Sequence, residues 1–258
     1  MQNASMKFDI TNLLEQWDYQ SGQVMVRKFK GKDGMEKIQL RVDLGLLQMN
    51  AEGRPDGKRP MGFASWFDCL LHKLDRHLQE HDGDDEHFTL SGEDCGRLQL
   101  EVLQYHHRYI CLIQLEEYEG ATRDTSRNLE VIDFVTDYAE TDELADTMEQ
   151  FRPQVLMLQT RARACRHLQE KHFDLAIREI ESGMTELKDF YQESGRETHE
   201  EHSPEILSLS SWLADVKSQR PLTRREKLEA DLKLAIQLED FEKAARVRDA
   251  LKDLPTLE

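Results

Sequence analysis

The N-terminal part of the chain carries the alternating apolar and polar pattern of β-strands. In Ile38–Leu44 the even-numbered positions are apolar and the odd-numbered positions are polar, which predicts a strand with one buried face. Val24–Phe29 predicts a partner strand, because Gly31–Gly34 between the two has the composition of a hairpin turn. Leu46–Met49 either extends the second strand or forms a third one. A short helix is expected before the sheet, at Ile10–Trp17.

From Ala64 onward the apolar residues recur every three or four positions, which is typical of helices with one buried face. Trp66–Leu78 shows this period, and the acidic segment Asp82–Glu86 ends that helix. Helical periodicity resumes near Gly92 and continues toward the C-terminus. The expected interruptions are an acidic stretch at Asp137–Glu149, a polar linker or frayed helix end at Glu193–Pro204, and a break at Gln219–Thr223. Thr223 is of the residue type that caps a helix, so it is expected to begin the last helical unit.

Two segments, IQLEEYEGA at 113–121 and IQLEDFEKA at 236–244, share an acidic pair, an aromatic residue, and an alanine three positions later. We expect the acidic pair to lie between two helices, with the carboxylates capping free amides. The aromatic residue and the alanine share a helix face, and the alanine lets a neighbouring helix approach closely. The pattern predicts a tight antiparallel helical hairpin. A weaker copy lies at 169–176, and the residues expected to shape the two hairpins in the middle of the chain are Tyr118, Ala121, Phe173 and Ala176.

These hairpins resemble tetratricopeptide repeats, which are helix pairs with a small residue in the first helix and an alanine early in the second. Ala164 fits the small position, whereas Tyr109 does not. The spacing between the copies is also longer than the roughly 34 residues of that family. The resemblance therefore implies tetratricopeptide-like hairpins over Asp94–Tyr191 without a regular array, and an irregular helical bundle is the alternative.

The C-terminal copy lies in a segment, Arg225–Leu251, that resembles the UVR motif found in UvrB, in UvrC and in the ClpC/McsA protein-quality-control group. The matching residues are Leu228, Leu232, Ala235, Glu239, Asp240, Phe241, Ala244, Ala245, Arg248, Asp249 and Leu251. The resemblance implies a helical hairpin that pairs with a second UVR hairpin or with a partner domain. It also indicates a bacterial protein.

Helical spacing divides the residues of this hairpin that we expect to bind a partner into two stripes. The first consists of Leu228, Leu232 and Ala235, and the second of Phe241, Ala244, Ala245, Arg248 and Leu251. Two helices of about 12 residues are only marginally stable alone, so the hairpin is expected to associate with another one. Arg248 either extends its charged end to solvent from the apolar stripe or forms an ion pair with a partner carboxylate.

Charge and composition limit the possible partners and compartments. The chain of 258 residues has a net charge of −17, which disfavours direct nucleic-acid binding. Gln219–Leu254 is the least acidic part, with nine Lys/Arg against eight Asp/Glu. The four cysteines are far apart, the first residues lack a secretory pattern, and no apolar run reaches the length of a membrane span. We expect a cytoplasmic protein with reduced thiols and no membrane partner.

The sequence carries none of the common motifs for catalysis or for cofactor binding. The sequence has no Walker A loop, no GxGxxG, no HExxH and no CxxC, so no catalytic residue, metal site or cofactor is predicted. Arg54, Lys58 and Arg59 are expected in a solvated turn, with anion binding as the alternative. An unrecognised activity within residues 1–90 is the remaining enzymatic alternative.

Together these patterns predict an α+β, predominantly α-helical protein. The expected parts are a small antiparallel sheet domain at 1–90, a tetratricopeptide-like helical domain at 91–215 and a UVR helical hairpin at 219–258. The leading functional hypothesis is a non-catalytic adaptor whose UVR hairpin recruits a protein partner or self-associates. The alternatives are an accessory role in UvrABC-type nucleotide excision repair and an adaptor role in Clp-type protein quality control. The McsA variant of the latter is disfavoured, because the zinc-binding cysteines expected of it are absent.

Overall fold

The computed structural model describes residues 9–194 and 203–252, which form two compact units divided after Leu213. Helices make up 66% of the structure, with a small antiparallel sheet near the N-terminus and a helix pair at the C-terminus. The predicted fold class is therefore confirmed. The finer division into 1–90, 91–215 and 219–258 stays a prediction. No helix in the described part is long and apolar enough to cross a membrane.

The sheet has the strand order β1-β2-β3, with β1 at Met25–Lys30, β2 at Glu36–Val42 and β3 at Gly45–Asn50. Both neighbouring pairs are antiparallel, so the sheet is a simple meander. The third strand confirms one of the two alternatives for Leu46–Met49. Val42 pairs with Gly45, which leaves Asp43 and Leu44 as a two-residue turn.

The expected single buried face of β2 is only partly correct. Ile38 is fully buried, but Leu44 is 88% exposed because it lies in the turn rather than in the strand. On the opposite face Gln39 and Arg41 are also buried. Gln39 accepts a hydrogen bond from Arg27 Nε at 2.7 Å, and Arg41 Nε donates to the carbonyl oxygen of Trp17 at 2.8 Å. The segment before β1 thus covers the polar face of β2. The alternating sequence pattern predicts that this face is exposed to solvent.

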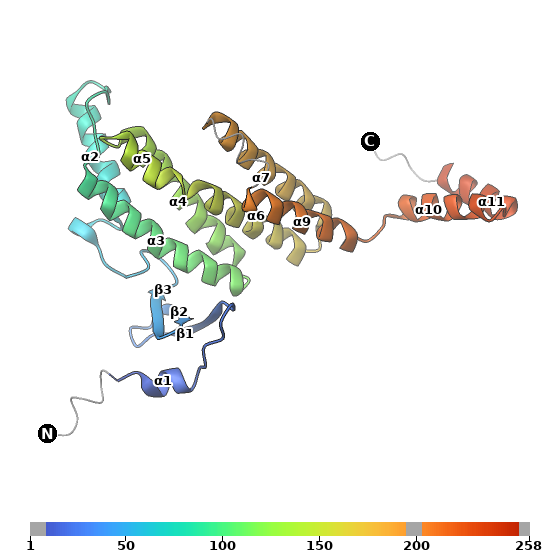
Figure 1. The fold of residues 1–258 in the computed structure, drawn as a ribbon, viewed down its shortest axis with the longest axis horizontal. Helices are drawn as coiled ribbons and strands as arrows, with labels where there is room; N and C mark the ends of the chain where they lie inside the picture. Colours follow the sequence, from blue (N-terminus) through green and yellow to red (C-terminus); the bar gives the residue numbers. More distant parts are fainter. Residues whose placement is uncertain (1–8, 195–202, 253–258) are drawn as a thin grey trace. The chain divides into compact units, whose positions relative to one another are not determined.

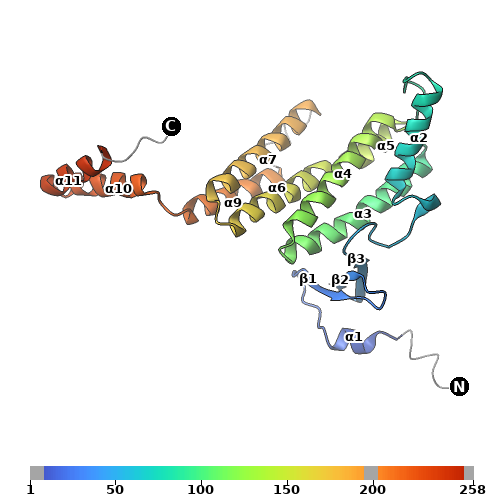
Figure 2. The same cartoon turned by 180° about the vertical axis from the view of Figure 1, so that it is seen from behind.

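Helices form the rest of the first unit, and the last of them, α9, continues past its end at Leu213 (Figures 1 and 2). Their bounds are α1 Thr11–Glu15, η2 Pro60–Gly62, α2 Trp66–Glu80, α3 Gly92–Gln114, α4 Tyr118–Tyr138, α5 Asp142–Glu149, α6 Arg152–Gln169, α7 Phe173–Glu193 and α9 Pro204–Gln219. Helix α3 packs against α4, α4 against α6, and α6 against α7. The predicted interruption at Asp137–Glu149 is correct only in part, because the helical run breaks between Tyr138 and Asp142 but the rest of the stretch forms α5. Met148 is buried on its inner face, and two acidic residues lie in its first turn, where negative charge suits the helix dipole.

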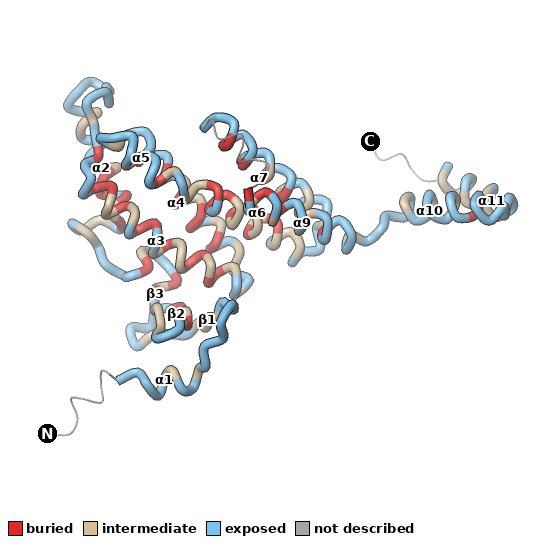
Figure 3. Tube along the Cα trace, in the orientation of Figure 1, coloured by how far each residue is buried: buried red, intermediate tan, exposed pale blue. Residues whose placement is uncertain are grey.

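Most of the core lies between these helices, and a smaller part lies between the sheet and the helices (Figure 3). One apolar cluster joins α2, α3, α4, α5 and α6, and a second joins the sheet to the C-terminal half of α3, to α4 and to α6. Helices α6 and α7 approach closely, because a Cβ atom at Gly183 would lie 2.8 Å from Cβ of Thr160. The glycine in α7 is therefore required by packing.

Buried charges connect the loop after β3 to the helices. Arg108 of α3 and Asp124 of α4 are both 1% exposed and form a two-pronged ion pair, with N–O distances of 2.6 and 2.8 Å. Glu101 of α3 is also fully buried, and its Oε2 lies 2.8 Å from Nε of Arg54. Arg54 is therefore not in a solvated turn and is not free to bind an anion. Its guanidinium is 9% exposed and holds the loop to α3.

The second unit contains a helical hairpin, with α10 at Arg224–Gln237 and α11 at Phe241–Lys252. Thr223 begins α10 as predicted. Its hydroxyl accepts a hydrogen bond from the backbone N–H of Glu226, and the Glu226 carboxylate accepts one from the backbone N–H of Thr223. Most of the expected linker after Glu193 lies outside the described residues, and Pro204 is the first residue of α9.

Candidate protein-interaction site

Three turns between helices share one backbone conformation. We name them by their residues: the first turn is 115–117, the second is 170–172 and the third is 238–240. The middle residue of each has a left-handed backbone, with φ of 60° at Glu116, 63° at Lys171 and 55° at Glu239. A left-handed residue at the end of a helix is usually glycine. All three turns instead have a charged residue in this position.

The hydrogen bonds of the three turns also match. In the third turn the N–H of Asp240 donates to the carbonyl oxygen of Ala235 at 2.9 Å, and the N–H of Glu239 donates to that of Ile236 at 3.1 Å. The equivalent bonds measure 2.8 and 3.0 Å in the first turn and 2.8 and 2.9 Å in the second. Each turn therefore closes its helix with the same pair of backbone hydrogen bonds. The sequence pattern correctly identifies three equivalent hairpins.

The predicted capping by the acidic pair holds at the third turn only. There Asp240 Oδ1 accepts a hydrogen bond from the N–H of Lys243 at 2.9 Å. At the first turn Glu116 is the exposed left-handed residue, and Glu117 makes no capping bond. The Glu117 carboxylate instead accepts hydrogen bonds from Lys28 Nζ at 2.9 and 3.0 Å, because β1 of the sheet lies beside this turn.

The three hairpins differ in how far their aromatic and alanine residues are covered. Ala121 and Ala176 are fully buried, and Tyr118 and Phe173 are half-buried. Burial raises the pKa of Tyr118 to about 12, and the neighbouring Cys165 of α6 and Glu116 add to the shift. The half-buried ring therefore lies beside Cys165 of α6. In the third hairpin Ala244 is only half-buried and Phe241 is 71% exposed.

Half-buried positions of the UVR hairpin form an inner seam between its two helices. On α10 these are Leu228, Leu232 and the fully buried Ala235, and on α11 they are Ala244, Val247, Ala250 and Leu251. Within the described residues of α10 and α11, Ala235 alone is buried. The seam therefore accounts for the hairpin's own packing.

The remaining predicted residues of α11 lie outside the seam, on an exposed face. Phe241, Ala245 and Arg248 recur at spacings of four and three, so they share one side of α11 and are all exposed. Leu234 of α10 and Leu238 of the third turn are 47% and 70% exposed. The single stripe predicted on α11 thus divides into seam residues and an outer face, which we define as Leu234, Leu238, Phe241, Ala245 and Arg248.

Ionic contacts at the hairpin leave the outer face with a weakly paired cation. The Arg248 guanidinium is 61% exposed and lies 3.8 Å from the carboxylate of the adjacent Asp249, which is a weak contact. At the start of α10, hydrogen bonds from Arg220 and from the Thr223 backbone lower the pKa of Glu226 to about 2. The start of the hairpin is therefore firmly capped. The exposed Arg248 side chain agrees with the alternative in which its charged end extends to solvent, and an ion pair with a partner carboxylate stays a prediction.

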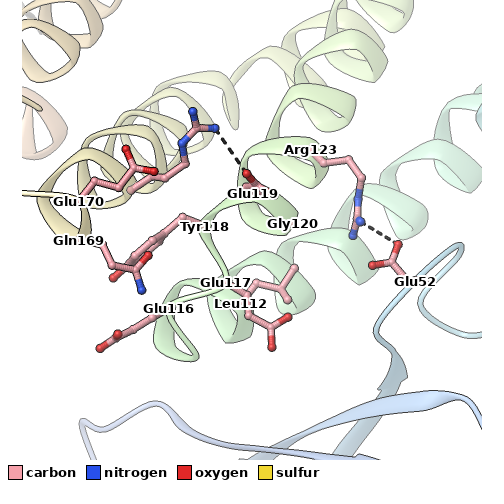
Figure 4. A pocket seen from close by; sticks show the side chains of 11 residues that line it. Glu52, Leu112, Glu116, Glu117, Tyr118, Glu119, Gly120, Arg123, Gln169 and Glu170 are labelled. Atoms are coloured by element: carbon pink, nitrogen blue, oxygen red, sulfur yellow. Dashed lines mark hydrogen bonds and ion pairs between the residues drawn. The ribbon is translucent and has the colours of Figure 1, made fainter. Parts of the chain in front are cut away.

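A different candidate site, which is concave, lies on the first unit beside the first and second turns (Figure 4). This cavity of 580 Å³ is lined mainly by charged side chains, among them Glu116, Glu119, Glu170, Arg123 and Arg166. Arg123 pairs with Glu52 at 2.7 Å, and Arg166 lies 3.8 Å from Glu119. Sequence reasoning misses this cavity, because its walls come from two hairpins and a loop that are distant in the chain.

Comparison with known proteins identifies one part of the chain. Residues 223–254 match the UvrB/UvrC motif, abbreviated UVR. No curated protein and no solved structure matches the chain significantly. The match begins at the cap of α10 and includes the third turn and all of α11. The α10–α11 hairpin of this protein therefore carries a UVR motif.

Proposed function

We propose that this protein is a non-catalytic adaptor that binds another protein through the outer face of its UVR hairpin. The observation that carries the proposal is the exposure of Phe241, at 71%, in a position where the equivalent Tyr118 is half-buried against the next helix. Exposed aromatic and leucine side chains on a short hairpin favour association, because covering them removes apolar surface from water. UVR motifs occur in interaction modules of DNA-repair and Clp-related proteins, which agrees with this role.

The chemistry of the outer face indicates what the partner offers. Leu234, Leu238 and Phe241 suit an apolar surface of the partner, and Arg248 suits a carboxylate at its edge. A second UVR hairpin provides both, because it carries the same exposed apolar residues and the acidic side chains of the turn. We therefore propose a second UVR hairpin as the partner, either on another protein or on a second copy of this chain.

The experiment compares Phe241→Ala with Tyr118→Ala in the full-length protein. Phe241→Ala is expected to leave thermal unfolding unchanged and to lower binding by at least tenfold, measured as dimerisation in sedimentation equilibrium or as capture of a UVR-containing partner. Tyr118→Ala is expected to lower the unfolding temperature and to leave binding unchanged. Capture that persists after removal of residues 219–258 would show that the hairpin is not the recruiting element.

A role in excision repair is the second candidate, since the motif occurs in proteins of that process. The net charge of −17 favours recruitment through a protein rather than through DNA. A titration of DNA at several salt concentrations tests this directly. Tight, salt-sensitive DNA binding by the protein alone would mean that it reaches DNA directly. If the protein alone does not bind DNA, recruitment through a protein partner is supported. The adaptor role in Clp-type quality control is tested by the same capture experiment with a Clp-type partner.

A further inference from the structure

The second turn, between α6 and α7, brings together two imidazoles and a carboxylate. His167 lies in the last turn of α6, Glu170 follows that helix, and His172 precedes α7. One ligand atom from each of the three side chains lies within 4.8 Å of the others. We propose that this cluster binds a divalent late transition metal ion such as Zn²⁺ or Ni²⁺.

The backbone of the turn produces this arrangement. The N–H of His172 donates to the carbonyl oxygen of His167 at 2.8 Å, and the left-handed Lys171 lies between the two helices. A spacing of five residues would not place two side chains together on a continuous helix. The turn shortens the path, so that side chains from the end of one helix and the start of the next meet. For this reason a search for helical metal motifs does not find them.

The donor set selects the class of metal. Two imidazole nitrogens with one carboxylate oxygen suit Zn²⁺, Ni²⁺, Cu²⁺ and Co²⁺, whereas Ca²⁺ and Mg²⁺ favour sites made of oxygen atoms. Donors at about 2.1 Å from a tetrahedral ion lie roughly 3.4 Å apart, so the cluster must contract slightly. Glu170 and His172 are 52% and 57% exposed and already lie 3.2 Å apart, so side-chain rotation is sufficient. Water would complete the coordination.

The surroundings of His167 support a ligand role. This side chain is 19% exposed, and its Nε2 lies 3.9 Å from Glu179 Oε1 of α7. Its Nδ1 is buried and has no hydrogen-bond partner within the described residues. Metal-binding histidines commonly have one ring nitrogen beside a carboxylate, which orients the ring. A metal ion would provide a partner for an imidazole that protein atoms leave incompletely paired.

The other two turns lack these donors although they have the same backbone. The positions of His167, Glu170 and His172 are occupied by Leu112, Leu115 and Glu117 in the first turn. In the third turn they are occupied by Ala235, Leu238 and Asp240. The proposed metal binding therefore depends on the side chains of the second turn and not on the backbone conformation that the three turns share. A bound ion would connect α6 with α7 and stabilise that hairpin alone.

Calorimetric titration of the full-length protein, kept reduced, with ZnCl₂ and NiCl₂ tests the proposal. We expect saturable binding of one ion, and at least a tenfold loss of affinity in His172→Gln and in Glu170→Gln. Because both side chains are about half exposed, these changes should leave the fold intact, as circular dichroism will show. A rise of the unfolding temperature on adding Zn²⁺ is expected for the unmodified protein and not for His172→Gln.

Two control variants separate this site from its rivals. His77 of α2 and His81, the residue after that helix, have stacked rings 4.0 Å apart, and Cys165 is a half-buried thiol. His77→Gln/His81→Gln and Cys165→Ser should each retain the affinity of the unmodified protein. Loss of binding in either control, or full affinity in a His167→Gln/His172→Gln double variant, would overturn the proposal. Equal affinity for MgCl₂ or CaCl₂ would overturn the assigned class of metal.

Discussion

The first two hairpins and the UVR hairpin have the same turn but different surroundings. In the α3–α4 and α6–α7 hairpins the alanine after the turn is fully buried, and the aromatic residue is half-buried. In the α10–α11 hairpin the alanine is half-buried and the aromatic residue is 71% exposed. The local sequence therefore determines how the chain turns, whereas neighbouring helices determine whether the turn's side chains are covered.

The same contrast holds for charge. In the first unit the cation of Arg108 is buried and held by Asp124 from the neighbouring helix. In the UVR hairpin the cation of Arg248 is exposed beside its sequence neighbour Asp249. A buried ion pair is satisfied within the fold, whereas an exposed cation on a partly apolar face remains available to a partner. This difference supports a structural role for the first two hairpins and an interaction role for the third.

Removal of one carboxylate from each region should give the largest difference between the two regions in the free energy of unfolding. Asp124→Ala leaves the Arg108 guanidinium buried without its counter-charge, and we expect a loss of about 3–5 kcal/mol in the free energy of unfolding. Asp249→Ala removes an exposed contact and should change it by less than about 0.5 kcal/mol. Denaturant unfolding followed by tryptophan fluorescence suits the first variant, and circular dichroism suits both.

A compensated variant shows whether that loss comes from the unpaired charge. Arg108→Met/Asp124→Leu removes both charges and should be much less destabilised than Asp124→Ala. An equal loss in the single and double variants would mean that volume, rather than charge, determines the stability of this contact. The difference in stability between the two regions would then come from packing and not from charge.

The aromatic-x-x-Ala spacing was enough to predict all three hairpins, because the turn conformation is local. The Arg108–Asp124 pair was not predictable, because its members lie on different helices and no spacing rule joins them. The UVR stripe was only partly predictable. Phe241 and Ala244 are both apolar and three residues apart, yet the rotation of α11 set by the turn places Ala244 in the seam and Phe241 outside it. Leu44 was misassigned because the two-residue turn ends β2 at Val42.

The two regions should also weaken at different pH values. Burial, with a contribution from His107, lowers the pKa of His106 to about 4 in the folded protein. Its unfolded pKa is near 6.5, so the unfolded state binds the extra proton as the pH falls from 6.5 to 4. The first unit should lose up to about 3 kcal/mol over this window. Glu226 has a folded pKa of about 2, so its contribution to the hairpin is present above pH 4.5 and is lost between 4.5 and 2.

Separate probes for the two regions are available. All three tryptophans lie in residues 1–213, so urea unfolding followed by their fluorescence at pH 7, 5.5 and 4.5 reports on the first unit. Nuclear magnetic resonance of α10 and α11 reports on the hairpin. His106→Gln should flatten the pH dependence of the first unit, and Glu226→Gln should affect only the hairpin. An unchanged slope in His106→Gln would assign the acid sensitivity to other groups.

Replacing the left-handed residue of each turn by glycine should give the smallest change in stability. This change should be similar in all three hairpins. Glu116→Gly, Lys171→Gly and Glu239→Gly each remove the Cβ atom that disfavours positive φ, partly offset by the greater freedom of glycine in the unfolded chain. We expect gains of up to about 1 kcal/mol, measured by thermal unfolding for the first two and by amide exchange across α10 and α11 for the third. Alanine at the same positions keeps the Cβ atom and should give no gain. Similar gains at all three sites would confirm that the turn is a local property of the sequence, whereas a gain at Glu239 alone would mean that packing in the first unit imposes the conformation there.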